Sequence, residues 1–332
     1  MVVGSREARG RTVWASAVQP PYTGTGVFQR EVYSRLADRG IQVMSSTEPR
    51  SRALRAIRSF IRVVGPPHAA ALVTATPAPL VLRVPVVAVV YDLRWRRTRG
   101  YLSRLYRYLD LRRTVATSEH IFAISQRTRD EMLELIPSAE GRCTVLHPGP
   151  GIVSEADFAQ GEAGAVLLAG KVEHKRNELV AEALAQAKPS WARRFLCVGV
   201  SDAAFQTLAQ AFGREACERF DEVDDDLMRT IFRRAHVYVT ASLEEGFGLP
   251  MVEALTAGCQ VVAICQPLTL EVMGDAAILI DDGEAADIAR QLQDPKWVAP
   301  EIRRSRASMF SWDQVAEAVS SALGRLARQP LT

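Results

Sequence analysis

Short apolar runs alternate with amphipathic stretches along most of the chain. The runs are rich in Val, Ile and Ala and are often flanked by Gly, Ser or Asp, as is typical of buried strands. In one amphipathic stretch, Phe28, Val32 and Leu36 recur at helical spacing until Gly40 ends the helix. Strands that alternate with helices predict an α/β fold of parallel sheets covered on both faces. The predicted strands are 13–18, 86–90, 121–125, 165–170, 195–200, 236–241, 260–265 and 277–281.

The alternation pauses at residues 148–163, which are rich in Pro, Gly and acidic residues. We interpret this segment as a linker between two domains, and a chain of 332 residues is long enough for two. The predicted domains are residues 1–155 and 160–310. Ligands of open parallel sheets bind beyond the carboxyl ends of the strands, so two such sheets facing each other would form a binding cleft.

The composition limits the class of protein. No run approaches about 18 consecutive apolar residues, so no membrane span is predicted, and the first residues show no apolar signal segment. The chain contains five cysteines but no Cys-x-x-Cys pair, and several lie in or beside apolar runs, which favours buried reduced thiols. We therefore expect a cytoplasmic protein.

Charge is divided unevenly between the two halves of the chain. Residues 1–150 carry 23 arginines and 11 acidic residues, a net charge of +12, whereas residues 151–332 have a net charge of −9. Arginines interleaved with apolar and aromatic residues cluster at 50–64 and 93–113. Two interpretations stay open: ordinary solvated helix faces, or peripheral binding to the anionic inner face of a membrane. We expect no nucleic-acid partner.

The segment 241–263 contains the clearest candidate for chemistry. It follows a predicted strand and opens on a tight loop, in which Gly246 and Gly248 allow the backbone to approach a ligand closely. Pro250 suits the first position of a helix over 250–257. The N–H groups of such a helix would point at an anion, for example a diphosphate.

Two glutamates flank this loop. Glu245 precedes it and Glu253 lies on the first turn of the predicted helix, so the turn would bring both carboxylates to one place. Carboxylates there would bind sugar hydroxyls through charge-assisted hydrogen bonds. The alternative from these residues alone is an ordinary strand–turn–helix joint with two solvated glutamates.

This segment resembles the signature of the retaining glycosyltransferases of family four, in which two glutamates are separated by seven residues. The resemblance includes ASLEEGFGLP, EALTAG and, at 270–282, LEVMGDAAILIDD. It implies the GT-B fold of two Rossmann-like domains, with acceptor binding by the first and nucleotide-sugar binding by the second. It also implies that a C-terminal helix at 312–328 packs back on the first domain, and that no metal or other cofactor is required.

Residues 169–179 resemble the family's cationic stretch, and Lys175 and Arg176 are its two cations in reversed order. The resemblance implies that they neutralise the donor diphosphate, which gains charge as the glycosidic bond breaks. Glu245 would hold the sugar and Glu253 the ribose. The catalytic candidates are Glu245, Lys175 and Arg176. The donor-binding candidates are Gly24, Gly26, Gly170, Lys171, Asn177, Glu222, Val223, Gly246, Phe247, Gly248, Leu249 and Glu253.

Glu222 and Val223 are candidates because 220–242 resembles the segment that holds the nucleobase through backbone contacts. The acidic run Asp224–Asp226 formally matches the DxD motif of metal-dependent transferases. Because it precedes an apolar helical pattern, we interpret it instead as an N-cap with first-turn charges.

The N-terminal half agrees with the family over several segments. Residues 20–36 resemble its glycine loop after the first strand, and Ser125 lies in a segment that resembles its Ser-x-x-Thr-Arg stretch. Many relatives have a His-Asp pair after the strand at 86–90, whereas this chain has Tyr91 and Asp92. Tyr91, Asp92 and Ser125 are the acceptor-side candidates.

The resemblance implies a retaining, metal-independent transferase that moves a sugar from a GDP- or UDP-linked donor to a glycan or a lipid-linked saccharide. The pair of motifs EGFGLP and GDAAILIDD is similar to those of polysaccharide mannosyltransferases, which favours mannose. The alternatives are a small soluble acceptor and a catalytically silent nucleotide-binding relative. A GT-B phosphorylase or epimerase would share the fold without transferring sugar from a nucleotide.

Overall fold

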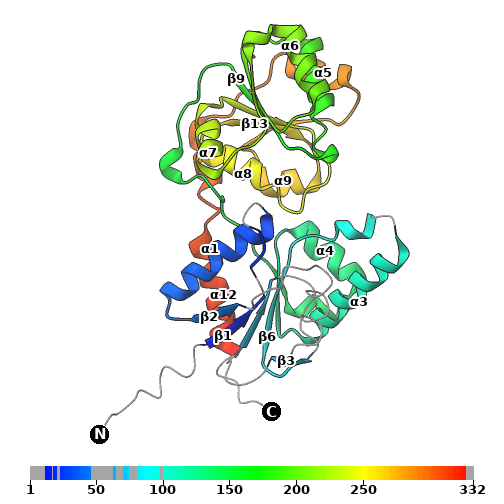
Figure 1. The fold of residues 1–332 in the computed structure, drawn as a ribbon, viewed down its shortest axis with the longest axis vertical. Coiled ribbons are helices and arrows are strands. Elements are labelled where there is room, and N and C mark those ends of the chain that lie inside the picture. Colours follow the sequence, from blue (N-terminus) through cyan, green and yellow to red (C-terminus); the bar gives the residue numbers. More distant parts are fainter. Residues whose placement is uncertain are drawn as a thin grey trace. The chain divides into compact units, whose positions relative to one another are not determined.

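The computed structural model describes residues 12–16, 18–20, 23–45, 63–64, 70–74, 81–97 and 100–326. Apart from 63–64, the basic stretch predicted at 50–64 lies outside the described residues. The chain forms two compact units: residues 1–148 with 311–332, and residues 149–310 (Figure 1). Within the described ranges, no helix is long and apolar enough to cross a lipid bilayer.

The first unit is built on a parallel six-stranded sheet with the strand order β2-β1-β4-β6-β7-β8. Helices α1 and α12 cover one face of the sheet, and α3 and α4 cover the other (Figure 1). A short parallel pair, β3 with β5, is separate from it. The strands are β1 Thr12–Ala15, β2 Gln42–Ser45, β3 Val63–Val64, β4 Ala70–Val73, β5 Val81–Leu82, β6 Val86–Val90, β7 His120–Ala123 and β8 Cys143–Val145. The α-helices are α1 Gly24–Asp38, α3 Tyr101–Thr117, α4 Gln126–Leu135 and α12 Trp312–Leu326. Two short 3-10 helices, labelled η, are η2 Arg94–Arg97 and η3 Pro137–Arg142.

Helix α12 joins this unit from the far end of the chain. Its apolar side chains recur every three or four residues and are buried. At its start Trp312 packs edge-on against Phe28 of α1, with ring centroids 5.7 Å apart. Arg35 of α1 forms an ion pair with Asp313 at 3.0 Å. The helix therefore covers a sheet whose strands precede it by more than 150 residues.

The second unit is also doubly wound. Its parallel sheet has the order β11-β10-β9-β12-β13-β14, with α5, α6 and α10 on one face and α7, α8 and α9 on the other (Figure 1). The strands are β9 Ala165–Ala169, β10 Arg194–Val198, β11 Cys217–Phe220, β12 Val237–Thr240, β13 Gln260–Ile264 and β14 Ile278–Ile280. The helices are η4 Glu155–Asp157, η5 Glu173–Lys175, α5 Asn177–Ala187, α6 Asp202–Phe212, η6 Arg214–Ala216, α7 Asp225–Arg234, α8 Leu249–Thr256, α9 Pro267–Met273, α10 Ala285–Leu292 and α11 Pro300–Ala307.

Burial explains why the strands of this unit were predictable. Every residue of β9, β12 and β13 is buried, because helices cover both faces of the sheet. Such strands need continuous apolar sequence rather than alternation. Leu168, Phe195 and Val262 are fully buried in one core cluster with α5, α6 and α10.

The predicted α/β class and all eight predicted strands are confirmed. Two details differ. Gly24 and Gly26 lie in the first turn of α1, whose N-cap is Thr23, rather than in a loop before the helix. Four of the five cysteines are free and buried, but Cys265 is exposed because it follows the end of β13.

Candidate functional site

The strand order of the second unit reverses between β9 and β12. From β9 the chain moves outward through β10 and β11, and from β12 it moves outward in the opposite direction. The loops after β9 and β12 therefore lead to helices on opposite faces of the sheet, which leaves a crevice at its carboxyl edge. Such a switch point is where open α/β sheets bind their ligands. Both main motifs predicted from the sequence lie in these two loops.

The loop after β12 ends at Gly248, the N-cap of α8, which has φ +87°. A Cβ at this position would lie 2.3 Å from the terminal methyl carbon of Met251, so that side chain would have to move, and the left-handed backbone would be strained for any residue other than glycine. Helix α8 begins at Leu249, one residue earlier than predicted, and Pro250 lies within its first turn. A proline is tolerated there because first-turn N–H groups have no partner within the helix.

Lys175 and Glu245 form an ion pair across the crevice. The Lys175 Nζ donates to Glu245 Oε1 at 2.5 Å, and both side chains are largely buried, with 12% and 13% of their surfaces exposed. Gly170, at φ +121°, makes room for this lysine, since a Cβ there would lie 2.7 Å from Lys175 Cγ. Asn177 Nδ2 also donates to Gly170 O at 2.8 Å and fixes the turn. The two sequence motifs thus meet at one pair of charges.

Arg176 has a different partner. It adopts the left-handed conformation, φ +53°, as the N-cap of α5, and its guanidinium forms an ion pair with Asp282 at 2.7 Å. Asp282 follows β14, at the other end of the sheet from β11, and the sequence did not single it out as a site residue. The two predicted cations therefore point to different carboxylates.

Glu253 is buried within α8, with 9% of its surface exposed. Its Oε1 accepts a hydrogen bond from the backbone N–H of Gly151 at 3.2 Å. Burial raises the pKa of Glu253 to about 7, and the nearby charge of Asp225 adds to this increase, whereas the backbone hydrogen bonds and the charge of Lys175 oppose it. The two signature glutamates therefore differ: Glu245 is held by a cation, and Glu253 by backbone donors.

Several polar residues of the crevice were not predicted. Ser242 lies two residues after β12, and its buried hydroxyl has no hydrogen-bond partner among the residues that the structure describes, although a buried hydroxyl normally has one. The signal that would have identified it is its place between the strand end and Glu245. The side chains around Lys175 and Glu245 are Tyr238, Thr240, Ser242, Met251 and Thr269.

Other donor candidates are spread along the same edge of the sheet. Glu222 and Val223 lie in the loop after β11, separated from β9 by β10. Asp224 caps α7 by accepting from Leu227 N–H at 2.8 Å, as predicted. Phe247 is buried with its ring against Phe310, so only its backbone is placed to face a ligand. No group of three or more potential metal ligands occurs among the residues that the structure describes.

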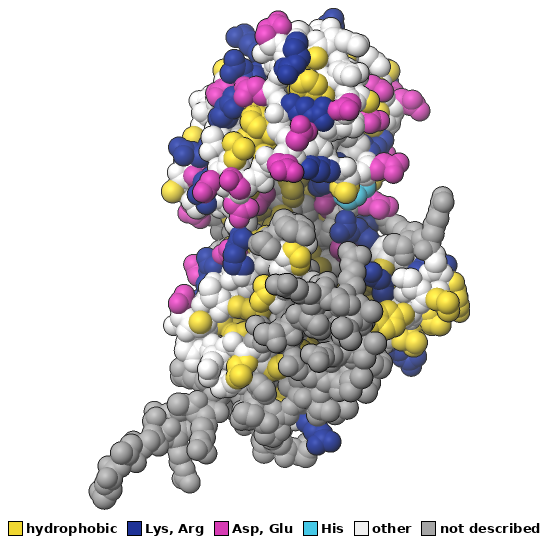
Figure 2. Space-filling model, viewed as in Figure 1, with side chains coloured by type: hydrophobic (Ala, Val, Ile, Leu, Met, Phe, Trp, Pro, Cys, Tyr) yellow, Lys and Arg dark blue, Asp and Glu magenta, His cyan; other side chains and the backbone are white. Residues whose placement is uncertain are grey.

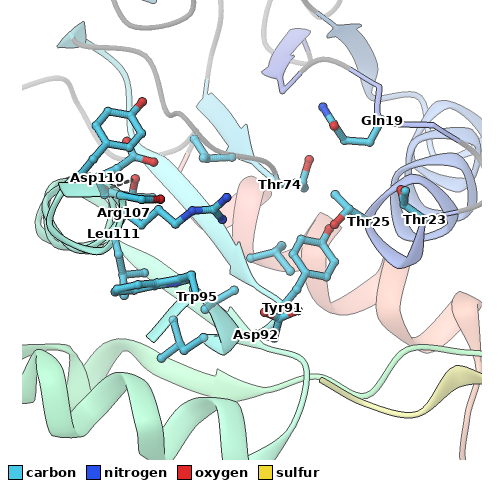
Figure 3. Close-up of a pocket in the computed structure, with 17 residues that line it drawn as sticks. Gln19, Thr23, Thr25, Thr74, Tyr91, Asp92, Trp95, Arg107, Asp110 and Leu111 are labelled. Carbon is cyan, nitrogen blue, oxygen red and sulfur yellow. Dashed lines mark hydrogen bonds between the residues drawn. The ribbon is translucent and has the colours of Figure 1, made fainter. Parts of the chain in front are cut away.

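Lys171 is exposed at the turn after β9, where its side chain packs over Gly199. In the first unit, Gly26 has a packing role, since a Cβ there would lie 2.0 Å from Pro20 O. Ser125 is fully buried as the N-cap of α4, and its Oγ accepts from Thr128 N–H at 3.1 Å. Tyr91 and Asp92 line a pocket of the first unit (Figure 3).

Comparisons with known proteins agree with this arrangement. The family described as "Glycosyl transferases group 1" matches residues 163–294. Over 122 residues the chain is 33% identical to O-antigen chain mannosyltransferase B of Escherichia coli, a match that covers 35% of this chain and 32% of that protein. The match thus spans about a third of the length of this curated relative.

Solved structures resemble the chain over nearly its whole length. A glycosyltransferase from Rickettsia africae has a TM-score of 0.67 at 13% identity, covering 96% of this chain and 99% of that one. Anabaena HepE in complex with UDP and glucose has a TM-score of 0.61 at 14% identity, covering 96% and 98%. Two doubly wound parallel sheets in separate units are the GT-B architecture of glycosyltransferases. The family match lies within the second unit, whereas the likeness to solved structures covers the fold of both units.

Proposed function

We propose that the protein is a retaining, metal-independent glycosyltransferase that moves a hexose from a nucleoside-diphosphate donor to a glycan or lipid-linked acceptor in cell-surface polysaccharide synthesis. The observation that carries the proposal is the Lys175–Glu245 pair at the switch point of the second sheet, beside the start of α8. The similarity to an O-antigen mannosyltransferase supports mannose and a polysaccharide product. In the proposed division of work, the second unit holds the donor and the first unit the acceptor.

The pair suggests how donor binding prepares the site. Lys175 neutralises Glu245 in the structure. A bound diphosphate is more negative than a carboxylate and would compete for Lys175, aided by the N–H groups at the start of α8. Glu245 would then be released to accept hydrogen bonds from the sugar hydroxyls.

The chemical step breaks the bond from the anomeric carbon to the phosphate oxygen and forms a bond from that carbon to the acceptor oxygen on the same face. The acceptor proton passes to the departing phosphate. Lys175 and Arg176 stabilise the charge that grows on the leaving diphosphate, and Glu253 holds the ribose hydroxyls.

Binding of diphosphates tests the donor site. We expect Arg176→Ala to weaken GDP or UDP binding about tenfold, because a charged hydrogen bond contributes about 1.5–3 kcal/mol, and to leave guanosine or uridine binding unchanged. Asp282→Ala should not weaken diphosphate binding, since it releases the Arg176 guanidinium from its ion pair. Titration calorimetry measures all four ligands. Arg194→Ala, at the first residue of β10, is the matched control. An equal loss for nucleoside and diphosphate would place Arg176 away from the phosphates.

A second surface favours a membrane-bound setting. On α3, Tyr101, Leu105 and Leu109 share one side of the helix at i, i+4 spacing, and they are 70%, 38% and 52% exposed. The buried residues of α3 lie on another side of the helix and are Asp110, Leu111, Thr114 and Val115. Figure 2 shows hydrophobic side chains with basic ones around them over α3. Because the surrounding charge is that of arginines, an anionic lipid surface is the proposed partner.

Vesicle binding tests this surface. We expect the protein to co-sediment with vesicles rich in anionic lipid at low salt and to be released at about 1 M salt, where the Debye length falls to about 3 Å. Leu105→Ser combined with Leu109→Ser should abolish binding without lowering Tm, because both side chains are exposed. Leu270→Ser, at an exposed leucine of the second unit, is the control. Binding that persists in the double variant would assign the membrane contact elsewhere.

A further inference from the structure

A bend at the start of the second unit contacts Glu253 of α8. The bend is formed by Gly151 and Ile152, just after the boundary of the two units at residues 148 and 149. The Gly151 N–H donates to Glu253 Oε1 at 3.2 Å, and the Ile152 N–H also favours the ionised carboxylate. Val153 follows them and is buried. Glu253 therefore takes backbone donors from a segment that lies far before it in the sequence.

Helix α7 holds this bend through one side chain. The Nε of Arg229 donates to Ile152 O at 2.7 Å, and its Nη1 pairs with Asp226 Oδ1 on the same helix at 3.3 Å. Only two soft dihedral angles separate the carbonyl of a residue from its own N–H group. A contact that fixes the Ile152 carbonyl therefore limits where the N–H groups of the bend can point, and those groups face Glu253.

The charge of Glu253 depends closely on these donors. Its pKa is raised to about 7, because burial and the negative charge of Asp225 oppose ionisation, whereas the two N–H groups and the charge of Lys175 favour it. Tyr238 also interacts with Glu253 and stays neutral, since burial raises its own pKa. Loss of the backbone donors would therefore favour the protonated form near neutral pH. A protonated carboxyl group accepts hydrogen bonds more weakly than a carboxylate.

We propose that Arg229 is a positioning residue of the donor site. By holding the bend, it keeps the Gly151 and Ile152 N–H groups on the Glu253 carboxylate and so places that carboxylate for the ribose hydroxyls. The inference rests on the proposed role of Glu253 and adds to it a residue that does not itself touch the donor. It also gives Asp226, which pairs with Arg229, a use within the acidic run at the start of α7.

Two substitutions of matched length separate the hydrogen bond from the charge. The Nε2 of glutamine lies as many bonds from the backbone as the Nε of arginine, so Arg229→Gln keeps a donor for Ile152 O and loses the charge. Methionine has a similar length but neither a charge nor a donor. We therefore expect Arg229→Gln to behave like the wild type and Arg229→Met to lose the effect.

Calorimetric titration with uridine and guanosine, each compared with its dideoxyribose form, isolates the ribose contact. We expect the wild type to bind one ribonucleoside about tenfold more tightly than its dideoxy form near neutral pH, because only a ribose donates to Glu253. Arg229→Met should reduce this ratio to about threefold or less and leave the affinity of the dideoxy form unchanged. Arg290→Gln, which breaks an ion pair of the same i,i+3 spacing on α10, is the control.

Two results of this titration would contradict the proposal. An equal loss in Arg229→Gln and Arg229→Met would assign the effect to the charge rather than to the hydrogen bond with Ile152. A wild-type ratio in Arg229→Met would show that the contact does not act on ribose binding. The Tm of each variant, measured in the same samples, shows that it is folded.

The titration of Glu253 gives a readout that needs no ligand. Carboxyl carbon NMR follows it, and the resonance is assigned by its absence in Glu253→Gln. Arg229→Met should raise the titration midpoint of Glu253, and Asp225→Asn should lower it. Asp202→Asn, at the first residue of α6 as Asp225 is of α7, should leave it unchanged. An unchanged midpoint in Arg229→Met would overturn the link between Arg229 and Glu253.

The two readouts separate this inference from the proposed function. If the wild type binds no nucleoside while the midpoint shifts in Arg229→Met, the donor role of Glu253 fails, and with it the positioning role. If ribose is preferred but Arg229→Met changes neither the preference nor the midpoint, the positioning role fails and the donor site stands.

Discussion

Glu245→Gln is expected to lower the rate of sugar transfer about 100-fold or more while GDP or UDP binds as tightly as before or more tightly. In the proposed mechanism the carboxylate acts on the sugar near the reacting carbon, and loss of one such contact in a site of this kind typically costs 10²–10³ in kcat. Diphosphate binding should not suffer, because Lys175 no longer has a charged competitor for its ammonium group.

The choice of glutamine matters for folding. Lys175 and Glu245 are nearly buried, and removing one partner of such a pair leaves an uncompensated charge that costs about 3–5 kcal/mol. Glutamine keeps the volume of the side chain and an oxygen that accepts from Lys175 Nζ. Glu173→Gln makes the same chemical change on the exposed neighbouring turn and serves as the control.

Transfer is measured by release of nucleoside diphosphate with a defined donor and acceptor, and nucleotide binding by calorimetry. A folded Glu245→Gln variant with full activity would remove the central claim. Nucleotide binding without turnover in the wild type, across a panel of donors and acceptors, would instead favour a catalytically silent relative.

Most of the strands that the sequence predicted are buried on both faces, whereas β14 was predicted from its apolar residues although it is a partly exposed edge strand. β9 and β13 are continuous apolar runs because helices cover both sides of each strand. The strands that were missed at the sheet edges, β2, β8 and β11, are short and contain polar residues, because an edge strand is partly exposed. β4 was missed for another reason: it is a short run of small residues in a part of the sequence with weak patterning.

The candidate site likewise has features that the sequence predicted and features that it did not. Residue types and loop chemistry were predictable, because Gly248, Pro250 and the Asp224 cap are dictated by local backbone conformation. The partners were not predictable, because Lys175 and Glu245 lie 70 residues apart and meet only through the order of strands in the sheet. The same holds for Arg176 with Asp282 and for Gly151 with Glu253.

Glu253→Gln is expected to change how stability depends on pH. The folded protein raises the pKa of Glu253 to about 7 from an ordinary value of 4.5, so between these pH values the folded state holds a proton that the unfolded chain releases. The contribution of Glu253 to stability is therefore full below pH 4.5 and is lost as the pH rises toward 7. A glutamine does not titrate and avoids this loss.

The difference in unfolding free energy, variant minus wild type, should consequently rise by about 2 kcal/mol between pH 5 and pH 8, since one pKa unit corresponds to about 1.4 kcal/mol. Calorimetric Tm values of both proteins across this range measure it, and an exposed glutamate on α5, in Glu182→Gln, provides the control. Parallel curves for wild type and Glu253→Gln would show that the carboxylate is ionised throughout. Nucleoside binding gives a second readout: an ionised Glu253 accepts more strongly from ribose hydroxyls, so wild-type affinity should increase through pH 7, whereas that of Glu253→Gln should stay flat.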